Sequence, residues 1–184
     1  MATACAEPDQ GGLYGIAQLR AIETSALNNL PGGTLMRRAG HSIALAAQRL
    51  LAGQVVRTPM LAAPKLSELT GAQVFIKYEN LQVTNSFKDR GAFVKLSSLT
   101  QAERNNGVIA MSAGNHAQGV AFSAARMECK AVICMPVTTP QLKIDGVRSR
   151  GGEWVEVVLH GESYSDAYTH AAKLQEKHGY TFVH

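Results

Sequence analysis

Two short motifs carry the residue types with the clearest chemistry in this sequence. TNSFKDRGA, residues 84–92, has Lys88 near its centre, and SAGNHAQG occupies residues 112–119. A neutral lysine amine is a nucleophile that forms an imine with a carbonyl compound. A glycine-containing turn that leads into a helix binds anions, because the first backbone N–H groups are free and the helix dipole is positive there. Together the motifs predict a site that holds an amino acid by its carboxylate and processes its amine as an imine.

The SAGNHAQG motif is expected on a turn between a strand that ends at Met111 and a helix that starts near Asn115. Ser112 can add a hydroxyl and Asn115 an amide, while Gly114 lets a ligand approach the backbone closely. An ordinary helix start with a glycine for tight packing explains the same residues. This stretch alone does not separate the two interpretations.

The TNSFKDRGA motif is expected to begin a helix, capped by Ser86 or Asn85, with Lys88 in its first turn. There the helix dipole and the nearby Arg90 favour the neutral amine over the ammonium ion. Asp89 is well placed at a helix start and offsets part of that field. A solvated surface lysine is the alternative interpretation of this motif taken alone.

The segments around the motifs alternate between short apolar strands and helices. Strands are predicted at 74–78, 108–111, 131–135, 154–158 and 180–183, and helices at 87–99, 115–127, after Pro140 and at 163–178. Thr100 begins a capping box for a further short helix. This alternation predicts right-handed βαβ units and a parallel sheet, with ligands at the carboxyl ends of its strands. Before it, helices are predicted at 13–30 and from Thr34 to about Leu51, ending at Gly53.

Composition excludes several classes of function. Hydrophobic residues make up 46% and charged residues 17% of the chain, which indicates a globular protein. The net charge is +4, but the basic residues are scattered, so nucleic-acid binding is not expected. The apolar stretches are too short to span a bilayer, so no membrane span is expected. No signal peptide is apparent, and a cytoplasmic location is expected. No metal site is expected, because neither the cysteines nor four histidines show ligand spacing: Cys5, Cys129, Cys134, His41, His160, His170 and His178.

The two motifs, in this order, resemble those of the fold type II pyridoxal-phosphate enzymes, and most of all the threonine/serine dehydratases (threonine ammonia-lyases). The resemblance runs from about Val55 to His184 and includes RTP, LSELTGA, KYENLQ and GESYSDA. It implies a tryptophan synthase β-like α/β fold and pyridoxal 5'-phosphate as cofactor. It also implies deamination of L-threonine or L-serine to 2-oxobutanoate or pyruvate and ammonia, as in isoleucine biosynthesis, by a homo-oligomer.

The resemblance also implies roles for single residues. Lys88 matches the lysine that binds the cofactor as a Schiff base and removes the substrate Cα proton, and Phe87 helps to shape the cofactor site. Asn115 matches the asparagine that hydrogen-bonds the ring hydroxyl oxygen of the cofactor. The loop that binds the substrate carboxylate is matched by Ser112, Ala113, Gly114, Asn115 and His116.

Three positions refine the resemblance. Ala113 stands where related serine racemases carry a second serine as a base, and its methyl group moves no proton, so elimination is favoured over racemisation. His116 favours the dehydratases over the cysteine synthases, which usually carry threonine there. Asn85 replaces a glycine common in the family, and asparagine tolerates left-handed backbone geometry better than most residues. A serine racemase or cysteine synthase remains the rival enzyme.

We expect residues 1–12 to be a disordered tail and residues 13–52 to be helical. Residues 53–184 are expected to be the N-terminal part of a dehydratase, with a large-domain piece at 53–95 and a small domain at about 96–184. Residues 13–50, most clearly Leu13 to Gly40, resemble the start of NAD(P)H-hydrate epimerase, which predicts a chimera. In this family, the glycine-rich loop that binds the cofactor phosphate lies further along the chain. The serine or cysteine that binds the pyridine nitrogen also lies there. We therefore expect an incomplete large domain and a chain inactive alone; the alternatives are a non-catalytic α/β fragment or an interaction role for the helices.

Overall fold

The computed structural model describes residues 34–184, with side chains from residue 40 onward. Contact clustering divides the chain into two units, Met1–Arg49 and Leu50–His184. Helix α2 spans Thr34–Leu51 and ends shortly before Gly53, which adopts a left-handed φ of 71°. This confirms the predicted end of that helix, although Thr34 lies inside the helix rather than before it. The expected tail at 1–12, the helix at 13–30 and most of the epimerase-like segment lie outside the described residues.

The second unit is built on a four-stranded parallel sheet. Its strands are β3 (Val108–Met111), β4 (Ala131–Met135), β5 (Val155–Leu159) and β6 (Thr181–Phe182), in the spatial order β5-β4-β3-β6. Every pairing between neighbours is parallel. The predicted βαβ architecture is therefore confirmed.

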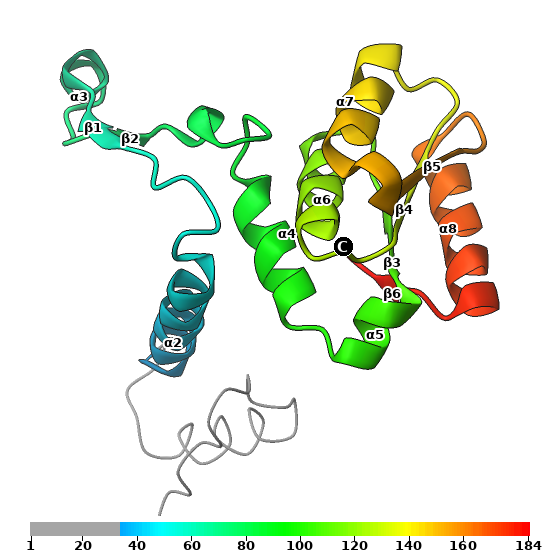
Figure 1. Ribbon diagram of the computed structural model, residues 1–184. Coiled ribbons are helices and arrows are strands. Elements are labelled where there is room, and N and C mark those ends of the chain that lie inside the picture. Colours follow the sequence, from blue (N-terminus) through cyan, green and yellow to red (C-terminus); the bar gives the residue numbers. More distant parts are fainter. Residues whose placement is uncertain (1–33) are drawn as a thin grey trace, which may run out of the picture. The chain divides into compact units, whose positions relative to one another are not determined.

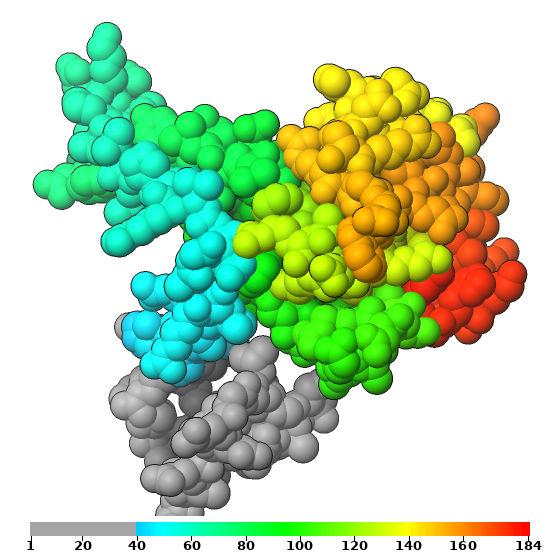
Figure 2. All heavy atoms as spheres, viewed as in Figure 1, coloured from blue at the N-terminus to red at the C-terminus, as the bar shows by residue number. Residues whose placement is uncertain are grey.

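Helices cover both faces of this sheet (Figure 1). Helices α4 (Lys88–Ser97), α6 (Asn115–Arg126) and α7 (Gln141–Gly151) pack with one face, and α8 (Tyr164–His178) packs with the other. Side chains alternate along each strand, so Val108 and Ala110 join the first core while Ile109 joins the second. Figure 2 shows the atoms of α6 and α7 packed against one another.

Local signals in the sequence explain where several helices begin and end. The capping box predicted at Thr100 is present, with Glu103 as its partner, and it starts α5 (Gln101–Asn106). A second capping box joins Ser163 and Asp166 at the start of α8, which ends at Gly179 with a left-handed φ of 70°. These interactions satisfy backbone groups that a helix end otherwise leaves free.

Other predicted boundaries differ by a few residues. The helix expected at 87–99 spans Lys88–Ser97, and the strand expected at 154–158 spans Val155–Leu159 after a 3₁₀ turn at Gly152–Trp154. The strands expected at 74–78 and 180–183 are shorter, and the first of them does not join the parallel sheet but pairs antiparallel with another short strand. The two cysteines of the described residues, Cys129 and Cys134, are buried free thiols.

The segment before α4 contains elements that the sequence analysis missed. Strand β1 (Met60–Ala62) pairs antiparallel with β2 (Phe75–Lys77), and α3 (Pro64–Thr70) connects them. Pro64 at the first helical position and Gly71 at the end, with a φ of 70°, are the signals that could have predicted α3. A 3₁₀ turn, η1 (Glu79–Leu81), follows β2.

The predicted division between residues 95 and 96 falls inside α4. Ala92 and Leu96 of this helix belong to the same core cluster as Val108 of β3. Helix α4 is thus part of the α/β body, and the separation of a large-domain piece from a small domain stays a prediction. Among the helices of residues 34–184, none is long and apolar enough to cross a membrane.

Candidate active site

The lysine turn lies directly before α4, of which Lys88 is the first residue. The backbone N–H of Lys88 donates to Ser86 Oγ at 3.1 Å, but the N-cap residue is Phe87 and has no side-chain capping bond, so the predicted cap by Ser86 or Asn85 is wrong. Asn85 adopts a left-handed φ of 58°. This confirms that asparagine occupies a position where the backbone favours glycine. The Lys88 amine lies over the Phe87 ring, 5.1 Å from its centroid, and that ring is exposed.

A buried hydrogen-bonded pair closes the same turn. The Asp89 carboxylate accepts a hydrogen bond from the Thr84 backbone N–H at 3.1 Å and another from the Thr84 hydroxyl. Both residues are almost completely buried. Sequence reasoning placed Asp89 at the helix start but did not find its partner, because a threonine five positions away has no periodic signal.

Arg90 pairs with a carboxylate. Its Nε and Nη2 donate to the two carboxylate oxygens of Glu79, at 2.8 and 2.7 Å. Hydrogen bonds from Arg90 lower the pKa of Glu79 to about 2, burial opposes this, and Thr58 and Gln82 lower it further. The same pair raises the pKa of Arg90. The guanidinium charge is therefore neutralised by a carboxylate of another segment.

The Glu79–Arg90 pair also explains why three conspicuous sequence motifs occur together. Gln82 of KYENLQ accepts from the Val56 N–H at 3.0 Å and donates to the Val56 carbonyl at 2.9 Å. Thr58 of RTP donates to Glu79, and Arg90 of the lysine motif also donates to the Val56 carbonyl at 3.3 Å. The network thus ties residues 56–58 and 79–82 to the helix that carries the lysine.

The SAGNHAQG turn follows β3 at the carboxyl edge of the sheet. Ser112 Oγ accepts a hydrogen bond from the Gly114 N–H at 3.2 Å, which folds the turn back on itself. Helix α6 then starts at Asn115 with no capping side chain and no acidic residue in its first turn. A Cβ at Gly114 would meet nothing within 4 Å, so the space beside its backbone is open. This arrangement suits an anion better than the alternative of a capped helix start.

The two motifs come into contact at Gly119, which lies in helix α6. A Cβ on Gly119 would lie 3.1 Å from the Lys88 carbonyl oxygen and 3.2 Å from its carbonyl carbon. Such distances are tighter than side chains normally adopt, so glycine lets the start of α4 approach α6 this closely. The last residue of one motif thereby positions the lysine of the other.

The predicted site residues differ in exposure. Ser112, Ala113, Gly114, His116 and Lys88 are half-buried, and Asn115 and Phe87 are exposed. The His116 ring nitrogen Nε2 lies 3.1 Å from the Val183 carbonyl. Burial lowers the pKa of His116, this hydrogen bond opposes the shift, and the charges of Lys88 and His184 lower it further. The lysine amine and the SAGNHAQG turn therefore belong to one electrostatic neighbourhood.

Comparison with known proteins identifies the family of this chain. A sequence profile described as "Pyridoxal-phosphate dependent enzyme" matches residues 51–184. The chain belongs to the pyridoxal-phosphate dependent enzyme family. The lysine turn and the uncapped start of α6 fit the carbonyl group and the anionic groups that pyridoxal phosphate and an amino acid bring to such a site.

Threonine dehydratases are among the most similar relatives. The biosynthetic L-threonine dehydratase of Burkholderia multivorans is 56% identical over 127 residues, which cover 69% of this chain and 25% of the relative. The L-threonine ammonia-lyase of Thermotoga maritima is 46% identical over 138 residues, 75% of this chain and 34% of the relative. The chain thus spans about a third or less of the length of these relatives. A threonine dehydratase of Nicotiana attenuata matches over 169 residues, so that alignment reaches beyond the 51–184 match into the N-terminal region.

Solved structures give the same fold for this family member. The processed threonine deaminase isoform 2 of Solanum lycopersicum superposes with a TM-score of 0.65 at 47% identity, covering 71% of this chain and 37% of that one. Maize serine racemase superposes with a TM-score of 0.69 at 30% identity, covering 75% and 41%. The α/β fold with a parallel sheet is therefore that of the fold type II enzymes.

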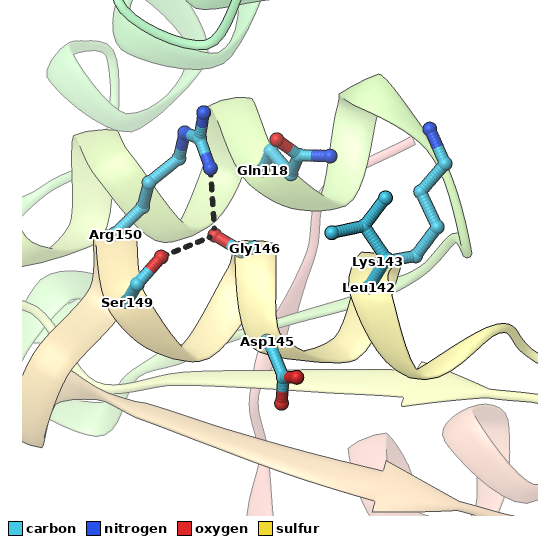
Figure 3. Close-up of a pocket in the computed structure, with 7 residues that line it drawn as sticks. All are labelled: Gln118, Leu142, Lys143, Asp145, Gly146, Ser149 and Arg150. Atoms are coloured by element: carbon cyan, nitrogen blue, oxygen red, sulfur yellow. Dashed lines mark hydrogen bonds between the residues drawn. The ribbon is translucent and has the colours of Figure 1, made fainter.

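A hollow between α6 and α7 adjoins the second half of the SAGNHAQG motif (Figure 3). Gln118 faces it from α6, and Lys143 and Arg150 lie on α7. Arg150 Nη1 donates to the Gly146 carbonyl at 3.1 Å, while its Nε is buried with no hydrogen-bond partner. On the same helix, Asp145 and Arg148 are exposed, whereas Arg150 is half-buried.

Two histidines that show no ligand spacing in the sequence come together in space. The rings of His160 and His170 stack with their centroids 3.9 Å apart. Within the described part of the chain, no group of three or more histidine, cysteine, aspartate or glutamate side chains could hold a metal ion. This ring contact joins the end of β5 to α8.

His116 makes the stability of the fold depend on pH. The pKa of His116 is lowered in the folded state from the value of about 6.5 that it has in the unfolded chain. As pH falls, the unfolded chain therefore binds the proton first. Its contribution to stability is complete above pH 6.5 and is lost as pH falls through the lower folded-state pKa. We expect His116→Asn to reduce the loss of unfolding free energy between pH 7.5 and 5, measured by urea denaturation. Because the pKa of His170 is also lowered, His170→Asn is measured alongside to separate the contributions of the two histidines; an unchanged pH slope in His116→Asn would contradict the assignment.

Proposed function

We propose that this chain provides the lysine and the carboxylate-binding turn of a pyridoxal-phosphate dependent ammonia-lyase for L-threonine or L-serine. The observation that carries the proposal is the contact at Gly119, which sets Lys88 against the helix of the SAGNHAQG turn. Identities of 56% and 46% to a threonine dehydratase and a threonine ammonia-lyase support this substrate class. The products are a 2-oxo acid, 2-oxobutanoate or pyruvate, and ammonia.

The proposed roles follow from the position of each group. The Lys88 amine attaches the cofactor and takes the proton from the substrate Cα. The free N–H groups at the start of α6 and the Ser112 hydroxyl hold the substrate carboxylate, and Asn115, which is exposed, can reach the cofactor ring hydroxyl. When bound, the cofactor would supply an electron sink for the electrons released when the substrate Cα loses its proton. Phe87, whose ring contacts the Lys88 amine, shields one side of the lysine.

Racemisation is the second candidate reaction, because maize serine racemase has the same fold over 75% of this chain. Reversal of configuration needs a proton donor on the face opposite the lysine. By the resemblance, Ala113 stands where serine racemases carry the serine that acts on that face, and its methyl group transfers no proton. Elimination of the β-hydroxyl is therefore the proposed reaction.

The location, pathway, assembly and partners of the protein are also proposed. We propose that it works in the cytoplasm, in isoleucine biosynthesis, as part of a homo-oligomer and without nucleic-acid or membrane partners. The name of the Burkholderia relative, a biosynthetic dehydratase, supports the pathway. The phosphate cradle would be supplied by polypeptide that the relatives have beyond their alignment with this chain. The epimerase-like origin of the N-terminal segment stays a prediction.

Trapping of the cofactor tests this proposal directly. Pyridoxal phosphate is added to the purified chain, the visible absorption is recorded, the adduct is reduced with borohydride, and peptides are mapped by mass spectrometry. We expect the adduct on Lys88 and its loss in Lys88→Ala. Lys95 and Lys143, which are exposed on α4 and α7, are internal controls in the same sample. Adducts spread over such surface lysines, or no adduct, would support the non-catalytic fragment instead.

A further inference from the structure

Asp89 is the only charged residue that is buried among residues 40–184, with 1% of its surface exposed. Moving a carboxylate out of water is costly unless other groups compensate it. In the described part of the chain, no lysine, arginine or histidine lies within salt-bridge distance of it. The adjacent cation, Arg90, is engaged by Glu79. Burial of the Asp89 carboxylate without a cationic partner costs free energy, which indicates a role other than simple packing.

Its compensation comes from the turn itself. Both carboxylate oxygens accept hydrogen bonds from Thr84, one from the backbone N–H and one from the hydroxyl. Thr84 is 2% exposed, so water does not compete for either bond. The position of Asp89 in the first turn of α4 adds the favourable interaction of a negative charge with the helix dipole.

The pair joins the two ends of the segment that presents the lysine. Between Thr84 and Asp89 the chain passes through the left-handed Asn85 and through Ser86, whose hydroxyl accepts from the Lys88 N–H. On the other side, the backbone of Lys88 lies against Gly119. The backbone of Lys88 is thus fixed from two directions, and only its side chain keeps freedom.

We propose that Asp89, through its two bonds to Thr84, is a positioning residue that sets the Lys88 amine for reaction with the cofactor carbonyl. This rests on the proposed function of Lys88. Adjacent helical residues point in different directions, so the buried Asp89 does not face the half-exposed Lys88 amine. It acts through the backbone of the turn.

Three substitutions test the pair. Asp89→Asn keeps the shape but places amide donors where Thr84 also donates. Thr84→Val keeps the shape and removes only the hydroxyl, while Thr84→Ser keeps the hydroxyl and is the conservative control. The full chain is treated with pyridoxal phosphate and borohydride, and the ratio of adduct on Lys88 to adduct on Lys95 and Lys143 is measured at early times. Amide hydrogen exchange of residues 84–90 and of β3 and β4 is measured on the same proteins.

We expect the Lys88 ratio to fall roughly tenfold in Asp89→Asn and Thr84→Val, since a displacement of about 1 Å can cost up to 100-fold in rate, and to be kept in Thr84→Ser. Exchange should quicken at residues 84–90 while β3 and β4 stay protected. An unchanged Lys88 ratio in a folded Asp89→Asn or Thr84→Val overturns the inference, as does faster exchange everywhere, which marks a merely structural role.

Failure of the proposed function gives a different result. If wild-type protein shows no preference for Lys88, the cofactor role is wrong, and hydrogen exchange alone then tests the pair. Local loosening in Asp89→Asn and Thr84→Val but not in Thr84→Ser still supports a turn held by Asp89. Equal exchange in all four proteins overturns it. If Asp89→Asn does not fold, Thr84→Val carries the comparison.

Discussion

Leu96→Ala is expected to lower the free energy of unfolding by about 3 kcal/mol, the largest effect of a single core substitution that we predict. Leu96 is completely buried in α4 and belongs to the core cluster that includes Val120 of α6 and Ile133 of β4. Truncation removes apolar contacts and leaves a cavity between helix and sheet. Urea denaturation followed by circular dichroism measures the change.

Leu142→Ala is the matched control, because the same side chain is removed from an exposed position of α7. Leu142 is 81% exposed, so we expect a change within about 0.5 kcal/mol. Equal effects of the two substitutions would show that α4 is not packed on the sheet as described. Since Lys88 begins α4, a loosened α4 also displaces the lysine turn.

Glu79→Gln is expected to lower the free energy of unfolding by about 2 kcal/mol at pH 7, because it leaves the Arg90 guanidinium without its carboxylate. The side chain of Glu79 is 17% and that of Arg90 30% exposed, so the effect should be smaller than for a fully buried pair. The lost bonds also join Glu79 to Thr58 and Gln82. Urea denaturation again gives the measurement.

A second ion pair of the same chain provides the control. Lys130 and Glu156 lie 3.7 Å apart with more than half of each side chain exposed, at 53% and 59%. Such pairs contribute little, so Glu156→Gln should change stability by less than about 0.5 kcal/mol. A small effect of Glu79→Gln, no larger than that of Glu156→Gln, would mean that the Glu79–Arg90 network does not hold the segment before α4.

Much of the α/β body could be predicted because its signals are local. The apolar run at 108–111, the capping boxes at Thr100 and Ser163, and Gly179 at the end of α8 each specify structure within a few residues. The segment 55–87 was harder, because its strands have only three residues each. Runs that short have no periodicity, and the helix between them is defined only by Pro64 and Gly71.

The sequence by itself determined the parallel βαβ order, the two turns at the sheet edge, and Lys88 as the residue to examine. Only the tertiary structure decided which groups meet. Gly119 packs against the Lys88 backbone, Arg90 pairs with Glu79, Asp89 binds Thr84, and the rings of His160 and His170 stack. Helix caps and strand patterns depend on neighbours along the chain. These four contacts depend instead on how packed helices, strands and folded loops bring separate residues together, and no spacing in the sequence encodes that.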